Sequence, residues 1–368
     1  MLKIEVDELT IEVTEFTRNL DLLDEFIRTN VLKMDDLLVV SESKHEKIYR
    51  KKFNYSAIVI LLYGYFENFI ERIAKQYVKE IAGLAESFEQ LPERIRKNHF
   101  SKSIELSQKL SLDKYKGLTT QDQIIANLFS CQNIQSKNFT LNVESYSMHT
   151  ANVRCEIIDA VFTDVGVEKI NQKIIDEPNF SKYLRDNDVE FRALPESEVK
   201  FLRGATLKLQ ERLKELAQRR NEIAHGVQVD NILSTEILQT EYINFLRQYA
   251  QSLNQVLQAS ISSFQKILLA DELKNYICIG SPVKVWQKGY IAGFPDVSND
   301  ITSRITVGDQ VIIEISKKRS KEYKKIKIMQ IYVNETPQEY IELSTLPLSF
   351  TLKLNEKIKE NHVVFVKK

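Results

Sequence analysis

Residues 219–226 read RRNEIAHG and close a segment whose apolar side chains recur at helical spacing. A glycine after the last periodic residue and a cation near the end are both typical of a helix C-terminus. Helical spacing resumes at 235, after the short turn GVQVDN at 226–231. We therefore predict two long helices, over 196–225 and 235–274, joined by this turn.

Two further long helices are predicted upstream, over 7–40 and 46–91. The apolar face of the second is wide enough to be buried on two sides, and Pro92 follows near its end. The residues that mark this face are Ile58, Leu61, Leu62, Tyr65, Phe66, Phe69, Ile70, Ile73 and Tyr77. The stretch 92–195 is less regular, and we expect short helices and loops that pack against the long helices.

At about Asn275 the apolar period changes from 3.6 to 2. Stretches such as DQVIIEIS and YKKIKIMQIYV then predict five to seven short strands in the last 94 residues. We predict an α+β multidomain chain. Residues 1–274 form an all-α helical bundle with an irregular insertion around 92–195, and residues 275–368 form a small antiparallel β-barrel or sandwich.

Charge and cysteine content exclude several classes of protein. The net charge is zero, although residues 275–368 carry 15 basic and 10 acidic residues. Three dispersed cysteines argue against a disulfide framework and a zinc site, and they fit a reducing compartment. The longest apolar run has ten residues, at 57–66, whereas a membrane span needs roughly 20. With no stretch resembling a signal peptide, we expect a cytoplasmic protein that does not enter a membrane.

The octapeptide also carries the groups that catalysis would need. A helix places Asn221 and His225 on one face, with Arg220 on a neighbouring flank. A helix C-terminus favours a protonated imidazole, and histidine suits general acid–base chemistry near neutral pH. A guanidinium is always charged, and its forked donors suit a phosphate. Such groups can cleave RNA without a metal, with His225 moving protons, Arg220 neutralising the phosphate and Asn221 orienting the reacting groups.

No motif elsewhere competes with these residues. The sequence contains no HExxH, Walker loop, GxGxxG, GxSxG or CxxC pattern, and it indicates no cofactor and no metal. On spacing alone, however, a histidine before a glycine at a helix end is more often a cap.

In its context of long helices, RNEIAHG resembles the motif of HEPN (higher eukaryotes and prokaryotes nucleotide-binding) ribonucleases. These domains carry arginine, a polar residue that is often asparagine, a few more residues and then histidine at the end of an inner helix. Arg220, Asn221 and His225 match that motif residue for residue. The segment LLYGYFENFIERIAKQYV at 61–78 is similar to the upstream helix of one prokaryotic branch, in which a glutamate, here Glu67, accompanies aromatic residues. The resemblance spans roughly residues 45–270.

The resemblance implies a homodimer in which two copies of the motif face each other and form one cleft. It implies metal-independent endoribonuclease cleavage of an RNA substrate that leaves a 2′,3′-cyclic phosphate. The setting it implies is a toxin or an anti-phage defence effector, with an antitoxin or a defence-system partner protein. Two alternatives remain open: a non-catalytic HEPN-like scaffold that binds RNA, nucleotide or a partner protein, and a helical oligomerisation module in which RRNEIAHG is only a cap.

Two secondary residues have open roles. Arg219 is either a second basic partner of the phosphate or a solvated flank of the helix. Glu67 lies in an apolar stretch, where an unpaired carboxylate is costly. It either pairs with Arg219 or Arg220 or lies near the cleft, or else it faces solvent or pairs with Arg72 or Lys75 on its own helix.

Other histidines, basic residues and aromatic residues lie outside this motif. We expect structural roles for the histidines, and both a structural and a nucleic-acid-binding role remain open for the others. The remaining histidines have no partner at catalytic spacing, so we expect surface or structural positions for them. The basic stretch 317–327 can track a phosphate backbone or protect a sheet edge with lysines. Trp286 and Tyr290 can stack on bases, although core packing is the commoner fate of such residues.

Overall fold

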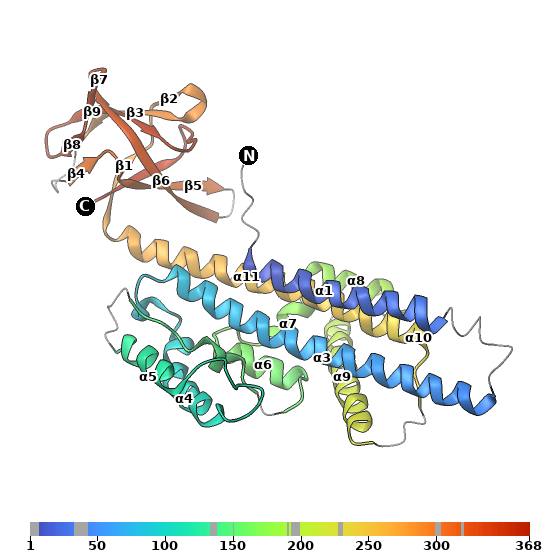
Figure 1. Cartoon of the computed structure of the whole chain (residues 1–368). Helices are drawn as coiled ribbons and strands as arrows, with labels where there is room; N and C mark the ends of the chain where they lie inside the picture. The colour runs from blue at the N-terminus through green and yellow to red at the C-terminus, as the bar shows by residue number, and fades with distance from the viewer. Residues whose placement is uncertain are drawn as a thin grey trace. The chain divides into compact units, whose positions relative to one another are not determined.

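A computed structural model describes residues 7–32, 43–132, 138–149, 151–189, 191–192, 199–226, 231–298, 303–317 and 320–368. The chain divides into two compact units, Met1–Ile261 and Ser262–Lys368. The first is helical, and the second combines the end of the last helix with a curled antiparallel sheet (Figure 1). The predicted fold class is confirmed: an all-α part precedes a small antiparallel β part. None of the described helices is long and apolar enough to cross a membrane.

The helical unit is built around one long helix, α3 (Lys44–Leu84), which packs against α1 (Glu8–Phe26) and α9 (Val199–Ala224). A capping box fixes its start, because the Ser43 side chain accepts from the Glu46 backbone while the Glu46 side chain accepts from that of Ser43. The helix ends seven residues before Leu91, where Ala85 turns to an extended conformation. The predicted continuation of the first helix to residue 40 lies partly outside the described residues.

The apolar face predicted for α3 is largely buried, with one change that matters for the site. Phe66 and Ile73 are buried as predicted, whereas Leu61 is exposed and Tyr63 is buried instead. Spacing alone could not separate these neighbours, since the helix is covered on two sides and its apolar face is correspondingly broad.

The remaining helices surround α3 and complete the unit. They are the π-helical turn Ile27–Leu32, α4 (Glu93–Lys109), α5 (Gln121–Ser130), α6 (Cys155–Asp164), α7 (Ile170–Ile175), α8 (Pro178–Asn187), α10 (Thr235–Ile237), the π-helical turn Leu238–Ile243 and α11 (Asn244–Leu273), together with short 3₁₀ turns at Phe88–Gln90 and Val143–Ser147.

A buried histidine anchors the less regular part of this unit. His99 on α4 is 2% exposed, and its Nε2 accepts a hydrogen bond from the backbone N–H of Asn142 at 3.0 Å. The Asn142 side chain donates in turn to Ser103 and to the carbonyl of Ile124. The His99 ring also stacks parallel to that of Tyr146. Burial lowers the pKa of His99 to about 4, so the histidine is neutral and structural.

We expect this histidine to make the helical unit acid-sensitive. The folded-state pKa of His99 lies below its usual value, so the unfolded chain binds more protons and stability falls as the pH drops from about 6.5 towards 4. Between pH 7 and pH 4.5 the free energy of unfolding should fall by about 2 kcal/mol more in the wild type than in His99→Gln. Urea unfolding of both proteins at the two pH values measures this difference, and equal losses would contradict a buried neutral His99.

The β unit is one curled antiparallel sheet, with strand order β1-β10-β5-β6-β9-β3-β2, and a two-stranded sheet of β4 and β8; β7 pairs with β6. The strands are β1 (Tyr276–Gly280), β2 (Lys284–Trp286), β3 (Ile291–Val297), β4 (Ser303–Thr306), β5 (Gln310–Lys317), β6 (Ser320–Val333), β7 (Thr336–Gln338), β8 (Tyr340–Leu343), β9 (Leu348–Leu354) and β10 (Val363–Lys367).

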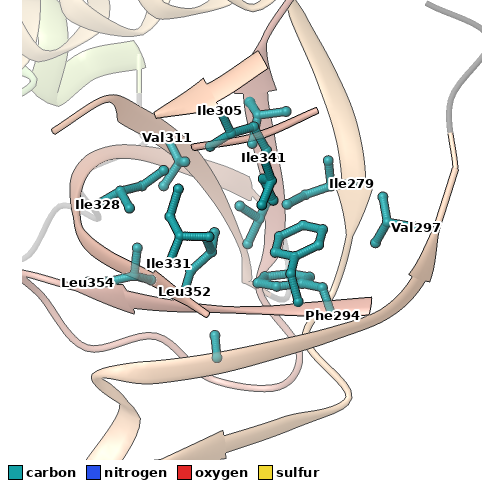
Figure 2. Close-up of a cluster of buried hydrophobic side chains, with 14 of the residues drawn as sticks. Ile279, Phe294, Val297, Ile305, Val311, Ile328, Ile331, Ile341, Leu352 and Leu354 are labelled. Atoms are coloured by element: carbon teal, nitrogen blue, oxygen red, sulfur yellow. The ribbon is translucent and has the colours of Figure 1, made fainter. Parts of the chain in front are cut away.

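The long strand β6 joins the two halves of the curled sheet. Its first half pairs with β5 and its second half with β9, and the register shifts between Ile328 and Gln330. Such an irregularity bends a strand and lets a sheet curl. Figure 2 shows side chains from many strands, among them Phe294, Ile331 and Leu352, gathered inside the curl as one apolar core.

Candidate active site

The RRNEIAHG segment ends α9 as predicted. The His225 backbone N–H donates to the carbonyl of Asn221 at 2.9 Å, so the helical bonding pattern continues through His225. Gly226 has φ +69°, the left-handed conformation that commonly ends a helix. Asn221 and His225 therefore share one side of the last turn, where His225 is exposed and Asn221 half-buried.

Arg220 lies in a cradle made of neutral groups. Its guanidinium carbon sits 4.9 Å from the centre of the Tyr63 ring. Its Nη1 donates to Oδ1 of Asn221 at 3.0 Å and to Oδ1 of Asn152 at 3.5 Å. Among the described residues, its ring and hydrogen-bond partners carry no formal charge. The cradle orients the cation while leaving its charge available for an anionic ligand.

Tyr63 links α3 to the segment that carries Asn152. Its hydroxyl oxygen accepts the backbone N–H of Val153 at 2.8 Å, and the hydroxyl donates to Oε1 of Glu67 at 3.5 Å. Burial, reinforced by the nearby Glu67 carboxylate, raises the pKa of Tyr63 to about 12, which keeps the phenol neutral. The ring is thus fixed in place beneath Arg220.

Glu67 connects the cradle to a partly buried ion-pair network. Its Oε1 lies 4.0 Å from Nε2 of His149, and the same nitrogen lies 2.7 Å from Oε1 of Glu71. Lys114 pairs with Glu71 from the other side. The hydrogen bond from His149 to Glu71 raises the pKa of His149. Burial alone would raise the pKa of Glu71, but the bonds from His149 and Lys114 lower it overall.

Glu67, Glu71 and His149 offer three ligand atoms that lie within 4.8 Å of one another, the strongest candidate for a metal site among the described residues. Glu71 already accepts bonds from Lys114 and His149, so a metal ion would have to displace a lysine. The donor set is therefore better described as an ion-pair network than as a preformed metal site.

Arg219 has a different environment from Arg220. It makes two hydrogen bonds to Glu215, at 2.6 and 2.9 Å, and donates to the hydroxyl of Tyr55 on α3 at 2.9 Å. A further bond reaches the carbonyl of Asn231, beyond the turn. Its side chain is 11% exposed. Arg219 thus holds the end of α9 against α3 and is not a solvated flank.

A family model described as RiboL-PSP-HEPN matches residues 19–259. The chain belongs to this family. The predicted resemblance to HEPN domains is confirmed, and the match covers α9 together with every residue of the Arg220 cradle. HEPN domains are often ribonucleases or nucleotide-binding modules, and many bind RNA. A comparison with curated proteins gives no match.

Within this HEPN domain the predicted residues fall into two groups. Arg220 and Asn221 are in direct contact, and His225 follows on the next turn. Glu67 is joined to the group through Tyr63, and its bonded partners among the described residues are Tyr63 and His149 and not Arg219 or Arg220. Arg72, one of the two cations on the same helix that were expected as alternative partners of Glu67, instead bonds Glu12 and Glu15.

Three residues of the site were not predicted. Tyr63 was assigned to no face of its helix, Asn152 lies in the irregular stretch, and His149 was expected to be a surface or structural residue. His149 has a 6% exposed side chain and completes the network beside Glu67. The available signal was the aromatic and acidic residues of 61–71, which indicate a polar group within a buried helix face.

Proposed function

We propose that this HEPN protein is a metal-independent endoribonuclease. The observation that carries the proposal is the Arg220 cradle, a fixed guanidinium with neutral partners that lies five residues before an exposed histidine at the same helix C-terminus. Arg220 is the phosphate ligand, His225 the general acid or base, and Asn221 the group that orients Arg220 and the phosphate.

The reaction forms one bond and breaks another at the same phosphorus. A histidine takes the proton of the 2′-OH while the 2′-oxygen attacks phosphorus. The bond from phosphorus to the 5′-oxygen then breaks, and that oxygen accepts a proton. The products are a 2′,3′-cyclic phosphate and a 5′-hydroxyl. The guanidinium of Arg220 stabilises the charge that develops on the non-bridging oxygens.

The two proton transfers support a homodimeric site. One imidazole serves as base and another as acid, so a second copy of the chain can supply the second His225. An exposed apolar row on α3 supports such an association, with Ile48, Tyr49 and Phe53 at 46%, 68% and 73% exposure. Tyr55, in the same stretch of α3, is buried and contacts Arg219 at the end of α9, so this part of α3 lies close to the motif. We propose that the two copies of the chain meet over the exposed row.

A protein that cleaves cellular RNA must be restrained until it is needed. We therefore propose a cytoplasmic toxin or anti-phage defence effector, with an antitoxin or defence-system protein as its partner. The β unit, which lies outside the HEPN match, is where we would expect recruitment of RNA or of that partner.

Cleavage of structured RNA in EDTA tests the proposal. The wild type should cut, and its fragments should end in a 2′,3′-cyclic phosphate and begin with a 5′-hydroxyl. RNA methylated at the 2′-oxygen should stay intact, since it lacks the attacking group. His225→Ala, purified identically, controls for a contaminating nuclease and should be inactive. Cleavage that needs a divalent ion, or equal activity of the variant, would refute the proposal and leave the non-catalytic HEPN scaffold.

A further inference from the structure

The solvent side of the sheet in the β unit carries a row of polar and aromatic residues. The register aligns Lys284 on β2, Gly293 on β3, Thr351 on β9 and Tyr332 on β6 across four neighbouring strands. The buried residues of these strands, among them Phe350, alternate with this row and face the core. The next row holds Trp286, Ile291, Lys353 and Gln330. We call these two rows the outer face; its strands are labelled in Figure 1.

The Trp286 ring lies against this face at Gly293 and not inside the core. It is 41% exposed, and a Cβ added to Gly293 would lie 2.9 Å from its ring. Glycine at 293 therefore makes room for the indole. A groove of about 320 Å³ runs beside it, with Trp286, Tyr332, Asn334 and Thr351 among its lining residues. An aromatic ring supported on one side and open to a groove is a surface on which a flat ligand can stack.

Cations accompany the aromatic residues of this part of the unit. Lys284 Nζ lies 5.5 Å from the centre of the Trp286 ring, and Lys357 Nζ lies 5.6 Å from that of Tyr290. On the outer face, Lys353 Nζ donates to Gln330 at 3.1 Å. Glu335 also lines the groove, and its negative charge is opposite to that of the lysines. Basic residues exceed acidic ones by five over 275–368.

We propose that the outer face of the β unit binds single-stranded RNA. Bases stack on Trp286 and Tyr332 along the groove, and phosphates lie against Lys284 and Lys353. Stacking needs unpaired bases, which favours a single strand over a duplex. The lysines favour a polyanion over an apolar peptide. The choice of RNA rests on the proposed function, whereas the stacking surface does not.

Trp286 is the chain's only tryptophan, so its fluorescence reports on this surface alone. The full-length protein is titrated with a 2′-O-methyl oligouridylate, which can bind but cannot be cut. We expect saturable quenching of the tryptophan emission. Quenching should also occur in His225→Ala, which separates failure of this proposal from failure of the nuclease proposal.

Variants then assign the binding to the outer face. Trp286→Ala should weaken binding of labelled oligouridylate, measured by fluorescence anisotropy, by about 5- to 100-fold, and Tyr332→Ala should also weaken it. Lys284→Ala should lower the slope of log affinity against log salt by about 0.7. Lys367→Ala, which removes the same charge from β10, is the matched control and should change neither. Circular dichroism of each variant checks that the sheet is intact.

Any one of three results would overturn the proposal. The first is that oligouridylate does not quench the tryptophan emission, and the second is that the affinity is unchanged in Trp286→Ala and Tyr332→Ala. The third is that duplex RNA binds as tightly as the single strand. Quenching by a proline-rich peptide but not by oligouridylate would assign the groove to protein recognition instead.

Discussion

Arg220→Ala is expected to lower kcat for RNA cleavage by about 10²- to 10³-fold, because it removes a fixed cation from the phosphate in the transition state. The same substitution should lower the free energy of unfolding by only about 1 kcal/mol. The partners of Arg220 among the described residues are the Tyr63 ring and two amide oxygens, which water can satisfy in the variant. Single-turnover cleavage and urea unfolding of the same preparation measure the two effects.

The neighbouring Arg219 provides the matched control. Arg219→Ala should lower the free energy of unfolding by about 2 kcal/mol, because it removes bonds to Glu215, Tyr55 and the carbonyl of Asn231. Its kcat, measured where the variant is folded, should stay within about tenfold of the wild type. A reversal of the two patterns, with Arg219→Ala inactive and Arg220→Ala active, would move the phosphate site to Arg219.

Local patterns were sufficient to predict the long helices and the change to strands. Apolar spacing within a helix or strand depends on the element itself, so the change of period near Asn275 matches a helix that ends at Leu273 and a strand that begins at Tyr276. The packing of the stretch between α3 and α9 could not be predicted in this way. Its anchor is His99 bound to Asn142, a contact that brings together distant parts of the chain.

The same distinction between local pattern and tertiary packing applies to the candidate site. Arg220, Asn221 and His225 all lie near one helix end, and helical geometry alone places Asn221 and His225 on the same side of it. Tyr63 and Asn152 reach Arg220 only through tertiary packing. Arg219 and Arg220 could not be separated by spacing, because their roles depend on which side of α9 meets Tyr55 and which meets Tyr63. A single sequence contains no direct signal for that rotation.

Phe53→Glu is expected to dissociate the proposed homodimer into monomers and to remove most of the proposed cleavage activity. Phe53 is 73% exposed and stands one helical turn from the exposed Tyr49 on α3. An aromatic residue at the centre of an interface commonly contributes 2 kcal/mol or more, and a buried unpaired carboxylate adds a further cost. The dimer Kd should therefore rise by at least about 30-fold. Sedimentation velocity and cleavage rates over a range of protein concentrations measure the change.

Phe129→Glu is the matched control for this prediction, because Phe129 on α5 is 63% exposed and belongs to a different surface. It should leave both mass and activity unchanged. If two copies share one site, the activity of Phe53→Glu should recover as its concentration is raised, since the catalytic groups of each chain are intact. A Phe53→Glu protein that remains dimeric would place the interface elsewhere. A monomeric protein with full activity would mean that one His225 serves both proton transfers, and the composite cleft would have to be abandoned.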